Sequence, residues 1–127
     1  MLQFYPKELG LKTYKNVYPQ INISLIKRIL KRCGKYLKKI SIKSLEYNVA
    51  CLITKYCRNI QSITCDKVSV EGLQELSINC KNISELYITD KMEQTDKADK
   101  VLAELFSNNK KFRIFHINSL KVIMNIY

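Results

Sequence analysis

Apolar residues recur along this chain in one local pattern, apolar-x-x-apolar-x-apolar, which appears four times. The last apolar pair in each copy is separated by one residue, the alternation that a strand with one buried face requires. The four copies occupy residues 33–42, 57–65, 80–88 and 109–117. Three begin with Cys33, Cys57 and Cys80, the fourth begins with Asn109, and these starts are 24, 23 and 29 residues apart. The recurrence predicts four short strands in equivalent environments.

A second apolar pattern lies upstream of each start residue. Apolar residues seven and four positions before the start line one side of a helix together with the start itself. They are Ile26, Ala50, Leu73 and Leu102 at the earlier position, and Ile29, Ile53, Leu76 and Leu105 at the later one. We expect Ser69 to cap the third helix, Thr95 or Asp96 to cap the fourth, and Gly34 to terminate the first. Each unit is therefore a helix of about three turns followed by a strand.

One helix–strand unit cannot bury its own apolar face, whereas units stacked side by side can. The pattern therefore predicts an α/β fold, a right-handed solenoid of about four helix–strand units. A short parallel sheet would line its concave side and the helices would cover the other side. We expect residues 23–127 to form this repeat domain and residues 1–22 to be a lead-in segment or a partial repeat.

The unit Cys-x-x-Leu-x-x-Leu-x-Leu, preceded by a helix, resembles the cysteine-containing leucine-rich repeat. Residues 32–40, 56–60 and 76–83 carry the likeness, which covers about residues 23–120. This repeat is typical of F-box proteins with leucine-rich repeats, the substrate receptors of SCF-type cullin–RING ubiquitin ligases. The resemblance implies a protein-interaction module in ubiquitin-dependent protein degradation. Its implied partner is a protein substrate or an adaptor of such a ligase.

Two features of the sequence depart from that family pattern. Residues 1–22 are too short to hold an F-box, the module that docks on the Skp adaptor, so adaptor binding is not carried over to this chain. Residues 120–127 are apolar enough to begin a further repeat. Both features predict either a partial chain or a truncated paralogue of a longer F-box receptor.

The candidate binding site follows from the strand pattern, because alternate side chains must point away from the core. In a solenoid these outward positions form a continuous concave wall, the surface that such proteins use for extended partners. Tyr87, Ile114 and His116 suit a protein interface. An unused, solvated strand face is the alternative. The outward positions are Lys39, Ser41, Lys43, Ser62, Thr64, Asp66, Glu85, Tyr87, Thr89, Ile114, His116 and Asn118.

Charge adds a rival interpretation. The chain has 127 residues and a net charge of +11, and residues 1–65 hold 13 Lys or Arg against 2 Asp or Glu. Such asymmetry indicates either a surface for nucleic acid or another acidic partner, or simply solvated helix faces. The densest run comprises Lys27, Arg28, Lys31, Arg32, Lys35, Lys38, Lys39 and Lys43.

The cysteines and the single histidine do not indicate catalysis or a metal. No Cys-x-x-Cys spacing occurs among the five cysteines, and His116 has no partner residues at a spacing typical of a catalytic site. We therefore expect no enzyme activity, no metal and no cofactor. No apolar run is long enough to span a membrane. The N-terminus lacks a signal-peptide pattern, so we expect reduced thiols in a cytoplasmic or nuclear protein.

Overall fold

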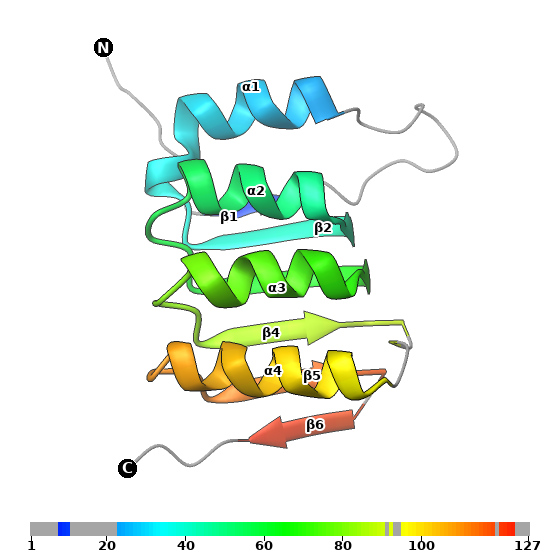
Figure 1. The fold of residues 1–127 in the computed structure, drawn as a ribbon. Coiled ribbons are helices and arrows are strands. Elements are labelled where there is room, and N and C mark those ends of the chain that lie inside the picture. Colours follow the sequence, from blue (N-terminus) through cyan, green and yellow to red (C-terminus); the bar gives the residue numbers. More distant parts are fainter. Residues whose placement is uncertain (1–7, 11–22, 91, 93–94, 119, 124–127) are drawn as a thin grey trace.

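The computed structural model of the chain describes residues 8–10, 23–90, 92, 95–118 and 120–123. Within these residues six strands form one sheet in chain order, and four α-helices lie side by side over one face of it (Figure 1). The helices are α1 (Ile23–Cys33), α2 (Tyr47–Tyr56), α3 (Val70–Asn79) and α4 (Asp96–Asn108). The parallel strands are β1 (Glu8–Gly10), β2 (Lys39–Leu45), β3 (Ser62–Val68), β4 (Glu85–Ile88) and β5 (Ile114–Ile117). The expected α/β fold with a parallel sheet is confirmed, whereas the solenoid stays a prediction.

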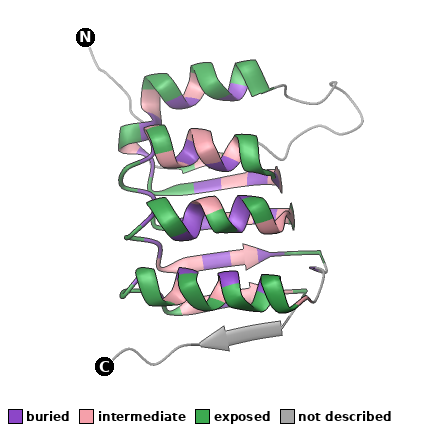
Figure 2. Cartoon of the chain, viewed as in Figure 1, coloured by how far each residue is buried: buried purple, intermediate pink, exposed green. Residues whose placement is uncertain are grey.

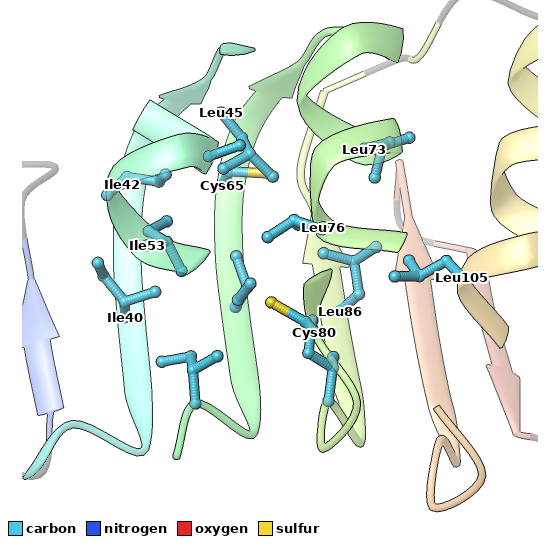
Figure 3. Close-up of a cluster of buried hydrophobic side chains, with 14 of the residues drawn as sticks. Ile40, Ile42, Leu45, Ile53, Cys65, Leu73, Leu76, Cys80, Leu86 and Leu105 are labelled. Carbon is cyan, nitrogen blue, oxygen red and sulfur yellow. The ribbon is translucent and has the colours of Figure 1, made fainter. Parts of the chain in front are cut away.

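The strands pair in the register that the sequence repeat predicts. Lys39 pairs with Ser62, Ser62 with Glu85, and Glu85 with Ile114. The last two pairing offsets equal the spacing between repeat starts, and the first is one residue shorter, because the first unit has one extra residue between Cys33 and its strand. The alternate side chains Ile40, Ile63, Leu86 and Phe115 form one buried row across β2 to β5. A second row follows two residues later, and helix residues such as Ile53 and Leu76 pack with both rows (Figure 3). The core therefore lies between the sheet and the helices.

The helix stripes match the prediction in the middle of the stack and differ at its two ends. Ala50 and Ile53 of α2, and Leu73 and Leu76 of α3, are fully buried. In α1 and α4, by contrast, the expected Ile29 and Leu102 are only half-buried, and their neighbours Leu30 and Val101 are buried instead. Among the described α-helices, α1 packs mainly on α2 and α4 mainly on α3. One flank of each end stripe is therefore left partly exposed (Figure 2).

The residue at each helix-to-strand corner is buried or half-buried. Cys57 and Cys80 are buried at the ends of α2 and α3, and the half-buried Cys33 donates a hydrogen bond to the Ile29 carbonyl at 3.2 Å. Asn109 replaces cysteine in the fourth unit and is also buried. Its Oδ1 accepts from the Ile83 amide at 2.9 Å, and its Nδ2 donates to the Leu105 carbonyl at 2.8 Å. The fourth corner is thus joined to the third by hydrogen bonds in addition to packing.

Two expected N-caps are present, and α1 ends directly before Gly34 as expected, but Gly34 lacks the left-handed conformation of a C′ glycine. The hydroxyls of Ser69 and Thr95 each accept a hydrogen bond from the third following residue at 3.0 Å, which leaves Asp96 inside the helix. No described glycine has a positive φ, so Gly34 does not end α1 in a left-handed conformation. It begins a short 3₁₀ turn, and a Cβ there would lie 2.7 Å from the Tyr56 carbonyl oxygen. Glycine is therefore needed at position 34 because the backbone of Tyr56 lies too close for a side chain.

The C-terminal part of the described chain turns back. Asn118 adopts a left-handed φ of 46°, and the strand β6 (Leu120–Ile123) then pairs antiparallel with β5. The expectation that residues 120–127 begin a further helix–strand repeat is therefore wrong for residues 120–123. Residues 124–127 lie outside the described residues. A tight reversal leaves no room for a helix between these strands, because a parallel continuation requires a crossover.

The glycines provide a direct test of this packing. A Cβ at Gly72 in α3 would lie 2.5 Å from the Leu45 carbonyl oxygen. Although alanine favours helix formation, we expect Gly72→Ala to lower the free energy of unfolding by about 1–3 kcal/mol. Gly10→Ala is the control, because no atom lies within 4 Å of a Cβ at that position. Urea unfolding followed by circular dichroism gives both values. Equal stability of the two variants would contradict the close approach of α3 to β2.

Candidate functional site

The face of the sheet opposite the helices, here called the outer face, carries the twelve predicted site residues in three rows. Lys39, Ser62, Glu85 and Ile114 form the first row, and Ser41, Thr64, Tyr87 and His116 the second. Lys43, Asp66, Thr89 and Asn118 continue the same offsets as a third row. Ten of the twelve lie within strands, whereas Thr89 and Asn118 lie one residue past the ends of β4 and β5. No helix of the described chain covers this face (Figure 1).

One outward position is closed to solvent. Ser62 is only 5% exposed, although it belongs to the outer row. Its small side chain lies in register between the longer side chains of Lys39 and Glu85. Ser62 therefore contributes to the shape of the face, and a partner would contact its neighbours instead.

Tyr87 and His116 form an aromatic pair at the β4–β5 side of the outer face. Their rings lie edge to face, with centroids 5.9 Å apart and an interplanar angle of 77°. Burial raises the pKa of the Tyr87 phenol, and the charge of Glu85 and a hydrogen bond to it raise it further. Tyr87 thus keeps its proton at neutral pH. A partly buried aromatic pair with polar tips is the kind of surface that protein interfaces use.

Polar side chains surround this aromatic pair and are partly fixed by one another. The Thr89 hydroxyl donates to Asp66 Oδ1 at 2.7 Å, which joins β3 to the end of β4. Arg113, just before β5, forms an ion pair with Glu85 at 3.3 Å. Because the Arg113 side chain is 63% exposed, this ion pair contributes little to stability. Its effect is to orient the Glu85 carboxylate beside Tyr87.

The thiols are not arranged for chemistry. Burial raises the pKa of Cys57 to about 12, with smaller contributions from Cys33 and Cys80, and raises the pKa of Cys80 to about 11. Both side chains therefore remain neutral thiols, the unreactive form. No disulfide joins any of the five cysteines, all of which lie within the described residues. Within the described ranges, no three His, Cys, Asp or Glu side chains come together in a way that could hold a metal ion.

The basic residues predicted to form a rival surface separate into two groups. Lys27, Arg28, Lys31 and Arg32 are all exposed on α1. Lys35 lies in the 3₁₀ turn after α1, Lys38 and Lys39 lie at the start of β2, and Lys43 lies within β2. Sequence reasoning missed a groove at this end of the strands, lined by residues of all four helix-to-strand turns. The signal in the sequence is a basic residue one or two positions after the corner in every unit: Lys35, Arg58, Lys81 and Lys110.

Comparison with known proteins gives no assignment. No protein-family model matches this chain, and no curated protein matches it significantly. None of the described helices is long and apolar enough to cross a membrane.

Thiol labelling tests the corner positions. With iodoacetamide at about pH 8, we expect Cys57, Cys65 and Cys80 to react far more slowly than the half-buried Cys33 and Cys51, because burial restricts access to all three. A raised pKa further suppresses the thiolate of Cys57 and Cys80. Peptide mass spectrometry gives the rate at each site, and the urea-unfolded chain is the control in which the five sites react alike. A fast reaction at Cys57 in the folded chain would disprove its buried placement.

The same shifts set a pH dependence. An unfolded thiol loses its proton near its ordinary pKa of 9.0, whereas folded Cys57 keeps its proton up to about pH 12. The folded state binds more protons across this interval, so these thiols make stability fall as pH rises above about 9. Cys57→Ala removes one titrating group and should flatten that fall.

Proposed function

We propose that this chain is a right-handed leucine-rich-repeat solenoid that binds another protein through the outer face of its sheet. The strand pairing supports the repeat, because equivalent apolar residues of successive units lie opposite one another from β2 to β5. The Tyr87–His116 pair carries the binding proposal, because it places aromatic surface on a face that no described helix covers.

The biological role that we propose follows from the resemblance of the repeats to those of F-box receptors. The chain would act as the substrate-recognition part of an SCF-type ubiquitin ligase receptor, in the cytoplasm or nucleus. The corner cysteines support this likeness, since Cys57 and Cys80 occupy equivalent buried positions and Asn109 takes the same place in the fourth unit. The role is one of binding, without catalysis or a cofactor.

One observation favours a second candidate, the binding of nucleic acid or another acidic surface. The side chains of Lys27, Arg28, Lys31 and Arg32 are exposed on α1, on the helical side of the molecule. Binding by such residues would weaken steeply with salt, because each phosphate contact releases a counterion. Binding by the outer face would persist at moderate salt, because apolar contacts carry its energy.

Affinity capture with matched variants tests the proposed function. The purified chain, Tyr87→Ala and Tyr47→Ala are used to capture proteins from nuclease-treated lysate at low and moderate salt. Tyr47 is the control because it is a 52% exposed tyrosine on α2, away from the outer face. We expect a specific protein whose recovery at both salts falls about tenfold with Tyr87→Ala and is unchanged with Tyr47→Ala.

The same experiment separates the rival interpretations. Recovery of a cullin and the Skp adaptor along with that protein would support a place in the ligase. Loss of all binding at moderate salt would favour the electrostatic candidate and contradict the receptor proposal. Equal effects of the two tyrosine substitutions would show that the outer face is not the binding surface.

A further inference from the structure

The four turns that lead from a helix into a strand are rich in positive charge. They span residues 34–38, 57–61, 80–84 and 109–113 and contain no Asp or Glu. Because the strands are parallel, all four turns lie at one edge of the sheet, on the left in Figure 1. We call the basic side chains of these turns the basic edge. They are Lys35, Lys38, Arg58, Lys81, Lys110, Lys111 and Arg113.

A groove of about 480 Å³ runs along this edge. Lys38 lines it from the first turn, and Lys111 and Arg113 line it from the fourth. Between them the lining is neutral and polar, with Asn59, Gln61, Asn82 and Ser84. The cations therefore stand at the two ends of the groove, and amide and hydroxyl groups fill its middle.

Three backbone carbonyls at the groove already accept two hydrogen bonds each. The carbonyl of Lys38 accepts hydrogen bonds from two amides of the second turn and β3, at 2.9 and 3.0 Å. The carbonyls of Gln61 and Ser84 each accept two amides from the next unit in the same way. Because a carbonyl oxygen has two lone pairs, these oxygens have no capacity for a ligand. These three carbonyls therefore leave recognition in the groove to its side chains and to its other backbone groups.

We propose that this groove binds an extended acidic peptide segment of a partner protein. Lys38 and Arg113 are three strand spacings apart, about 14 Å. An extended peptide covers that distance in about four residues, and residues four apart point to the same side. Acidic side chains at positions i and i+4 would thus meet the two cationic ends. The amides of Asn59, Gln61 and Asn82 would contact the peptide main chain between them.

The chemistry of the lining distinguishes a peptide from a nucleic acid. Single-stranded nucleic acid is held by aromatic side chains on which bases stack, in addition to charge. None of the lining residues is aromatic. Groups that hydrogen-bond a peptide main chain occupy the positions where a nucleic-acid site would need rings. This site lies beside the outer face and does not depend on the function proposed for that face.

Fluorescence anisotropy with the full chain tests the proposal. The probe is a labelled peptide of about ten residues with Glu at every second position, and the same peptide with Gln is the reference. We expect the Glu peptide to bind more tightly, and Lys38→Ala combined with Lys111→Ala to weaken its binding about fivefold. Both lysines are exposed, so folding should be preserved, and circular dichroism verifies this.

Lys97→Ala combined with Lys100→Ala is the matched control. These exposed residues of α4 lie near its start, away from the groove, and their loss changes the net charge equally. The proposal holds if this pair changes the affinity less than twofold. Equal weakening by both pairs would overturn it in favour of attraction to net charge alone. Tighter binding of oligothymidylate of the same charge than of the Glu peptide would overturn it in favour of nucleic acid.

Discussion

Each helix–strand unit of this chain has a single apolar side, and the burial of that side requires a neighbouring unit in register. The strand pairing keeps one offset from β2 to β4 and a longer one into β5, where the connection between β4 and α4 is longer. Burial of the apolar side chains therefore requires equivalent residues of neighbouring units to lie opposite one another in the sheet. Gly34 and Gly72 follow from the same constraint, because a Cβ at either would press on a backbone carbonyl of another unit. Packing between units therefore favours glycine at these positions, although helix propensity alone would favour alanine.

Parallel stacking also determines where charge collects. All four helices end at the same edge of the sheet, so their partial negative charges lie side by side. Acidic residues in the first turns, Glu71, Asp96 and Asp99, lie near the opposite ends, where they favour the dipoles. Basic residues from both halves of the sequence therefore meet at one edge of the folded sheet. Lys111 and Arg113, from the balanced second half, join Lys38 from the basic first half.

The sequence predicts the α/β class, the strand register and most of the core, because each rests on a period that packing must obey. Ile40, Ile63 and Leu86 could be assigned to one buried row without coordinates. The buried faces of α1 and α4 could not be predicted as well, because the burial of Ile29 and Leu102 depends on which side of each helix has a neighbouring helix. The alternation of apolar and polar residues predicts the positions of the outer face. It does not predict the burial of Ser62, which depends on the longer side chains of its paired residues Lys39 and Glu85. The groove was missed because it joins single residues of four distant turns.

The helix dipoles explain only part of the basic edge. Their effect falls off within the last turn of a helix, so it accounts for Arg58 and Lys81, which directly follow the corner cysteines. Lys38 and Arg113 lie five residues after the last residues of α1 and α4, beyond that range. Arg113 has an ion pair with Glu85, whereas within the described residues Lys38 and Lys111 have none. Folding therefore gives no reason for two of the three cations that line the groove. A ligand with negative charge at both ends would explain why cations stand at both ends of the groove.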